Sequence, residues 1–147
     1  MKIGIANDHR GYELKKYLEE ELTKLGYEVI NYGTNSTESV DYPDYAFKLG
    51  TEVASKNVDF GVAICGSGIG ISIACNKVKG IRCAKVSNVE EAKYTREDNN
   101  SNIVAFGEKT TKEEALEIVK TFIETPFSNL EKHIRRIEKI NSYEENK

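Results

Sequence analysis

A thiol stands next to three alternating glycines in the run Val62-Ala63-Ile64-Cys65-Gly66-Ser67-Gly68-Ile69-Gly70-Ile71-Ser72. Glycine adopts positive φ angles without a steric cost and lets the backbone approach a ligand closely. We expect a strand to end at Cys65 and a helix to follow the glycines, with its free N–H groups and positive dipole end pointing back at the loop. Such a turn would hold an anionic or oxyanionic group beside the thiol.

The thiol itself could take part in chemistry. Cysteines at helix N-termini are more acidic than free cysteines, so we expect Cys65 to act as a base or nucleophile near neutral pH. Taken alone, a cysteine is more often a small buried hydrophobe, and Cys75 and Cys83 fit that description inside a predicted helix and a predicted strand. Ser67 either orients a hydroxyl or carbonyl of a ligand or serves only the turn.

The glycine run is not a dinucleotide-binding fingerprint. Ile71 occupies the position of the third glycine, the run follows the third predicted strand, and the Gly-Lys-Ser/Thr of a P-loop is missing. A tight turn without a ligand and a nucleotide-binding module remain as alternatives.

Two further polar pairs follow predicted elements. Asp8-His9 leaves the first strand, where Asp8 either caps the next helix or contacts a ligand, and His9 is either solvent-exposed or a ligand. Asp98-Asn99 stands where a helix is expected to end. Aspartate is unfavourable at the C-terminal end of a helix dipole, which indicates either a role for Asp98 or an earlier helix end.

Basic residues gather on the last predicted helix, at Lys132, His133, Arg135 and Arg136. Lys132 and Arg136 are four residues apart and share a helix face. They form either a solvated face or a phosphate site. A phosphate site in the cleft requires this helix to reach the carboxyl edge of the sheet, in its own subunit or across a dimer.

The composition is that of a globular protein, with 39% apolar and 31% charged residues among 147. A net charge of -3 gives no electrostatic reason to bind nucleic acid or an anionic membrane. No stretch reaches the roughly 20 apolar residues of a membrane span. We expect one domain over residues 1–147, without a signal peptide, because the chain begins directly on a strand pattern.

The three cysteines and two histidines do not form a metal or disulfide pattern. The cysteines are odd in number and lack a Cys-x-x-Cys spacing, and His9 and His133 are far apart in sequence. We therefore expect no metal, no cofactor and a reducing cytoplasm.

Short β-branched runs alternate with helical patterns, which predicts βαβ units and a parallel sheet. The expected strands are 2–6, 28–32, 60–64, 81–86 and 103–106, and the expected helices are 12–25, 43–56, 71–78, 88–97, 111–123 and 130–140, with a frayed tail over 141–147. Asn88 and Thr111 are the predicted helix caps. The fold class is α/β, a three-layer α/β/α sandwich with a doubly wound, Rossmann-like five-stranded parallel sheet and an extra C-terminal helix.

In such sheets ligands bind outside the carboxyl ends of the strands. Asp8-His9 follows the first predicted strand, the Cys65 loop follows the third, and Lys109 follows the fifth. Because all three groups follow the carboxyl end of a strand, the sequence predicts one site at this edge of the sheet.

These residues together resemble the ribose-5-phosphate isomerase B family, which includes the galactose-6-phosphate isomerase subunits. The resemblance covers essentially the whole chain. Its motifs are Asp8-His9-x-Gly11, Ser39 to Tyr45, Cys65 to Ala74 with Asn76-Lys77 and Gly80-Ile81-Arg82, Asn99 to Gly107, and His133-x-x-Arg136.

The resemblance implies a metal-free aldose–ketose isomerase of a phosphorylated sugar. The cysteine matching Cys65 is the base that moves a proton between C1 and C2, and the loop Gly66, Ser67, Gly68, Ile69 and Gly70 holds the enediolate. Other matched positions bind substrate, with Lys132 and Arg136 lent by the partner subunit of a homodimer. They are Asp8, His9, Tyr42, Asn99, Lys109, Lys132 and Arg136.

This chain departs from the family at three positions. The family usually has a ring-opening His where Asp98 stands, and Lys109 and Lys132 replace the more common Arg, which exchanges a bidentate fork for a point charge. We expect a cytoplasmic homodimer, or a tetramer, that interconverts ribose 5-phosphate and ribulose 5-phosphate with Asp98 as the acid. The alternatives are an isomerase of a six-carbon sugar phosphate of the allose or galactose type, and a sugar-phosphate-binding regulator that has lost catalysis.

Overall fold

Five strands form one parallel sheet in the order β2-β1-β3-β5-β4. The computed structural model describes residues 1–147. The strands are β1 (Lys2–Asn7), β2 (Glu28–Asn31), β3 (Phe60–Cys65), β4 (Cys83–Lys85) and β5 (Ile103–Gly107). The helices are α1 (Tyr12–Lys24), α2 (Tyr42–Ala54), α3 (Ile69–Cys75), α4 (Val89–Asn99), α5 (Lys112–Glu124) and α6 (Glu131–Glu145), with a 3₁₀ turn η1 (His9–Gly11). The predicted doubly wound α/β fold is confirmed.

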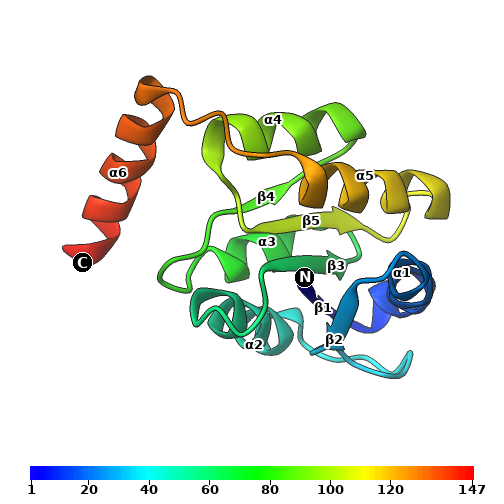
Figure 1. Cartoon of the computed structure of the whole chain (residues 1–147). Helices are drawn as coiled ribbons and strands as arrows, with labels where there is room; N and C mark the ends of the chain where they lie inside the picture. The colour runs from blue at the N-terminus through cyan, green and yellow to red at the C-terminus, as the bar shows by residue number, and fades with distance from the viewer.

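The sheet has a helix layer on each face (Figure 1). Helices α1, α4 and α5 bury Leu18, Ala92 and Phe122 against one face, together with Ile5 and Ile64 of the strands. Helices α2 and α3 cover the other face with a second apolar cluster. The side chains of a strand alternate between the two faces, so each central strand contributes to both clusters.

The two faces differ in the size of their strand residues. On the α2/α3 face the central strands carry small residues, among them Gly4, Ala6, Gly61 and Ala63. A Cβ on Gly4 would lie 2.9 Å from Leu49 of α2, so α2 packs directly on the backbone of the sheet. Cys65 belongs to this same face, at the end of β3.

Two predicted helix caps are confirmed. The Asn88 side chain accepts the N–H of Glu91 at 2.8 Å, and Thr111 Oγ1 accepts the N–H of Glu114 at 3.2 Å. Pro43 lies in the first turn of α2, where its missing N–H costs no helical hydrogen bond.

Three elements differ most from their predicted boundaries. Helix α3 spans Ile69–Cys75 instead of 71–78, because Gly68 turns the chain at φ +81° and Asn76 leaves the helix to bond both backbone groups of Cys83. That contact lies at the start of β4, which is shorter than the predicted 81–86. Helix α6 continues through Glu145 instead of fraying from 141, because its last turn is held by Glu144, which accepts the N–H of Gly80 at 2.9 Å.

Helix α6 stands apart from the sheet, beyond the end at which the strands begin (Figure 1). Ile137 is its only buried residue, while Ile134, Ile140 and Tyr143 are exposed apolar residues on it. None of the helices is both long and apolar enough to span a bilayer.

Candidate active site

The loops after β1, β3 and β5 meet at one edge, because these three strands are neighbours in the sheet. The N–H of Asp8 donates to the carbonyl of Ile64 at 3.2 Å, and the N–H of Glu108 donates to the carbonyl of Cys65 at 3.0 Å. These bonds tie the loops together around a cavity of about 780 Å³. Its walls are Asp8, Arg10, Tyr42, Cys65, Gly66, Ser67, Gly70, Lys85, Val86, Ser87, Gly107, Lys109, Thr110 and Glu114.

Cys65 is 4% exposed, and its side chain borders this cavity. The N–H of Gly68 donates to its sulfur at 3.2 Å. A donor aimed at sulfur stabilises negative charge there once the thiol has given up its proton. The thiol is therefore buried on the side of the α2/α3 layer and open on the side where a ligand would lie.

The glycines of the loop serve different geometric needs. Gly68 has φ +81°, and a Cβ there would lie 2.6 Å from the backbone carbonyl carbon of Phe106. A Cβ at Gly70 would lie 2.6 Å from the ring of Tyr42, so the absence of a side chain lets that ring reach the cavity. Ser67 Oγ accepts the N–H of Ile69 at 3.1 Å, which supports the turn, and Ser67 also lines the cavity.

Asp8 is buried, and its carboxylate caps the turn η1 by accepting the N–H groups of Arg10 and Gly11 at 3.0 and 3.3 Å. It also lines the cavity, so the capping role and ligand contact are compatible. His9 is not part of the cavity wall. Its Nδ1 accepts the N–H of Val40 at 3.2 Å and so holds the loop that precedes α2.

Arg10 is a cavity residue that the sequence interpretation did not assign. It makes a two-pronged ion pair with Glu108, with Nε and Nη2 donating at 3.1 and 2.6 Å. A Cβ at Gly66 would touch its guanidinium at 3.2 Å, so Arg10 lies across the glycine loop. The hydrogen bond from Arg10 lowers the pKa of Glu108, and the same bond raises the pKa of Arg10.

Lys85 and Ser87 were missed as well, although a signal for them existed. Lys85 is the last residue of β4 and Ser87 lies just after it, and the rule that ligands lie beyond the carboxyl ends of parallel strands applies to β4 as it does to β3. The sequence interpretation applied that rule only to the first, third and fifth strands.

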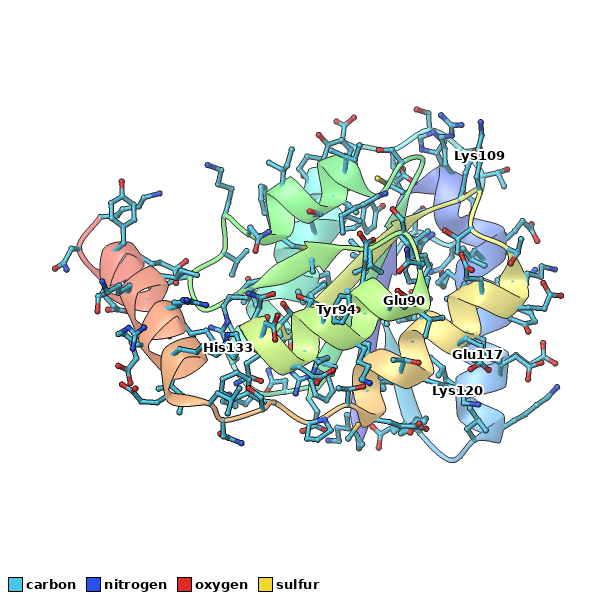
Figure 2. The ribbon with its side chains drawn as sticks, turned by 90° about the horizontal axis from the view of Figure 1, so that it is seen from above. Glu90, Tyr94, Lys109, Glu117, Lys120 and His133 are labelled. Atoms are coloured by element: carbon cyan, nitrogen blue, oxygen red, sulfur yellow. The ribbon has the colours of Figure 1, made fainter.

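The remaining predicted site residues lie elsewhere in this chain. Gly68 and Ile69 belong to the loop but not to the cavity wall. Asp98 and Asn99 end α4, which runs back from the carboxyl edge of the sheet, and Lys132 and Arg136 lie on α6. Figure 2 shows Lys109 and His133 at opposite ends of the molecule. The predicted residues thus form two groups, and α6 does not reach the cavity of its own chain.

A family comparison connects this arrangement with known enzymes. The model of a family described as "Ribose/Galactose Isomerase" matches residues 3–140. The chain belongs to this family. The predicted resemblance is thereby confirmed, and the chain is an aldose–ketose isomerase.

Individual relatives extend the similarity over the whole length. The Escherichia coli ribose-5-phosphate isomerase B is 39% identical over 98% of this chain and 97% of its own length. The solved Clostridium thermocellum ribose-5-phosphate isomerase B superposes with a TM-score of 0.96 at 47% identity, covering 99% of each chain. The Mycoplasma genitalium enzyme, solved with bound ribulose-5-phosphate, superposes with a TM-score of 0.94 at 36% identity over 99% of this chain and 97% of that one.

Proposed function

We propose that this isomerase interconverts ribose 5-phosphate and ribulose 5-phosphate, with Cys65 as the base. The observation that carries the proposal is the position of the Cys65 sulfur, at the border of the cavity and in contact with the N–H of Gly68 at 3.2 Å. The names of the full-length relatives support the choice of substrate.

The reaction moves one proton between neighbouring carbons. Cys65 takes the proton from C2 of the open-chain aldose, the electron pair forms the C1–C2 double bond, and the C1 carbonyl oxygen becomes an enediolate oxygen. A proton then passes from O2 to O1, Cys65 returns its proton to C1, and C2 becomes the ketone. A general base must both remove the proton from C2 and deliver it to C1, and a base of intermediate strength serves both proton transfers.

Negative charge develops on oxygen in this reaction, so fixed donors aimed at that oxygen lower the barrier. We assign this task to the loop from Gly66 to Gly70, with Ser67 beside it. The N–H groups of Gly68 and Ile69 already donate to Cys65 and Ser67, so the donors to the oxygen are the other N–H groups of the loop. Each well-aimed donor of this kind is worth roughly 3 kcal/mol.

Substrate binding falls to the side chains around the cavity. Asp8 and Tyr42 lie on the wall near the loop, and Lys109 supplies a positive charge for the phosphate. We include His9 among the substrate-binding residues because it directly follows Asp8 in the chain. The distant phosphate then contributes binding energy that orients the reacting carbons.

We further propose a homodimer in which each site is shared. The supporting observation is that the end of α4 and helix α6 lie away from the carboxyl edge of the sheet (Figure 1). The end of α4 carries Asp98 and Asn99, and α6 carries Lys132 and Arg136, so a second chain is needed to bring them to the cavity. The exposed apolar residues of α6 give such a partner a surface to cover, and further pairing of dimers makes a tetramer. In this assembly Asp98 is the acid for ring opening, Asn99 contacts the sugar, and Lys132 and Arg136 bind phosphate.

The aspartate at position 98 also leaves a second candidate function. The family usually has histidine at this position, so a six-carbon sugar phosphate, or binding without turnover, is the rival function. We expect the reducing cytoplasm as the site of action, which the three free thiols favour.

A substrate panel tests the proposal. The values of kcat/KM are compared for the 5-phosphate of ribose and the 6-phosphates of allose and galactose, with exchange of the C2 proton into D₂O as a second readout. The proposal predicts the highest kcat/KM for ribose 5-phosphate and no loss after treatment with a chelator. Saturable binding without proton exchange would establish the regulator instead.

A further inference from the structure

Two titratable side chains meet where α4 ends and α6 begins. His133 Nε2 lies 3.4 Å from Asp98 Oδ1. The side chain of His133 is 12% exposed and that of Asp98 is 51% exposed. Of the two side chains, Asp98 is thus the one open to solvent, and His133 is mostly covered.

Other contacts also hold this region together. Arg96 Nε donates to the carbonyl of Thr125 at 3.2 Å, and the N–H of Ser128 donates to the carbonyl of Glu97 at 3.2 Å. These bonds already tie the end of α4 to the segment that leads into α6. The Asp98–His133 contact is an addition to these bonds.

Two of the neighbouring charges have other partners. Glu97 contacts Lys93 at 3.9 Å, and Arg135 contacts Glu131 at 3.7 Å. The ion-pair partner of Asp98 is His133. The two therefore form a separate unit, next in sequence to Asn99.

We propose that Asp98 and His133 act together as the acid–base unit that opens the sugar ring, with Asp98 facing the sugar and His133 holding the proton behind it. This inference rests on the function proposed above. A lone exposed carboxylate has no proton to give at neutral pH, whereas histidine is the side chain that ordinarily titrates there. The pair supplies the proton that an aspartate alone lacks.

The step balances within the pair. The ring oxygen gains a proton that Asp98 passes on from His133, and the bond from that oxygen to C1 breaks with its electrons staying on oxygen. The C1 hydroxyl then loses its proton to the pair and becomes the aldehyde. The pair ends with the proton count with which it began, and no other reactant is consumed.

Ribulose 5-phosphate offers a clean test, because its 5-hydroxyl is esterified and it cannot close a five-membered ring. Exchange of its C1 proton into D₂O needs the base and the enediolate but no ring opening. Turnover of ribose 5-phosphate needs the base, the enediolate and ring opening. The ratio of the two rates therefore isolates the ring-opening step.

The experiment measures both rates for His133→Gln, Asp98→Asn and the control Arg135→Gln, which removes a charge from the same helix. We expect His133→Gln and Asp98→Asn to lower ribose 5-phosphate turnover at least about tenfold, as loss of an acid–base group does, and to lower proton exchange far less. The control should change neither rate. In an Asp98→His background, adding His133→Gln should cost little, because the new histidine carries its own proton.

Other results would overturn the inference. Equal loss in both rates, with a fall in Tm, would make the contact purely structural, and equal retention of both rates would leave the pair without a role. If the unaltered protein catalyses neither reaction, the proposed function fails first. If it catalyses both and the ratio is unmoved in both variants, only the ring-opening pair is refuted.

Discussion

The Cys65 sulfur and the N–H of Gly68 form a hydrogen bond of 3.2 Å within one tight turn. Gly68 itself adopts φ +81°, and this angle turns the chain that follows it into α3. The residue that donates to the proposed base is thus also the residue at which the loop turns into the helix.

Replacing Cys65 by Ala tests the base directly. We expect turnover and proton exchange to fall by about two to four orders of magnitude, because the proposed base is removed, while sugar-phosphate binding survives. Proton exchange by NMR and binding by thermal shift measure the two effects. Cys83 is a half-buried thiol that does not line the cavity, so the variant Cys83→Ala is the control and should keep its activity. Normal turnover in Cys65→Ala would end the assignment.

Gly68→Ala should destabilise the fold by about 2 kcal/mol or more, because a non-glycine residue at positive φ is strained and its Cβ would strike the Phe106 backbone at 2.6 Å. Gly26→Ala is a matched control, since Gly26 has φ +96° with nothing within 4 Å of its Cβ. Urea unfolding gives the loss in free energy of unfolding for each variant. Gly26→Ala suffers only the backbone strain, so the additional loss in Gly68→Ala measures the collision with Phe106. Equal losses would show that Phe106 moves aside freely.

Gly70→Ala should disturb the site more than the fold. Its Cβ would lie 2.6 Å from the Tyr42 ring, which is partly exposed and can swing away from the cavity. We expect a higher KM for the sugar phosphate and a nearly unchanged Tm. Tyr42→Ala should raise KM in the same direction, and a normal KM in both variants would remove Tyr42 from the binding site.

The Arg10–Glu108 ion pair predicts a pH-dependent contribution to stability. Arg10 lowers the pKa of Glu108 below its ordinary value of 4.5, so the pair stabilises the fold above that value. The stabilisation is lost as the pH falls through the lowered pKa of the folded state. The Tm difference between the unaltered protein and Glu108→Gln should therefore be present at pH 7 and shrink in strong acid. A difference that is independent of pH would contradict this assignment.

Mixed dimers test whether the site is shared. Cys65→Ala and Arg136→Ala homodimers should each be nearly inactive. After unfolding and refolding together, half of the dimers are mixed and each of these has one intact site, so about a quarter of full activity should return. Refolding each variant alone is the control. Absence of recovery in verified mixed dimers would place both residues in one chain.

Much of the site was predictable because it depends on local patterns and one general rule. Alternating strand and helix patterns require a parallel sheet, and the carboxyl ends of parallel strands share an edge. Asp8, Cys65 and Lys109 were therefore expected together, and they line one cavity. The glycines of the loop were recognisable because few other residues allow so tight a turn.

Contacts between distant segments were not predictable from such patterns. Arg10 lies over Gly66 because Glu108, 98 residues away in sequence, holds its guanidinium there. Likewise, nothing periodic in the sequence places His133 against Asp98.

The sequence by itself determined the sheet, its helices and the chemical groups at the carboxyl edge, because periodicity and strand direction are properties of short segments. Only the tertiary structure decided that α4 and α6 carry Asp98 and Arg136 to the opposite end of the molecule. The direction in which a helix leaves its strand, and the side chains that meet when it docks, depend on packing across the whole chain.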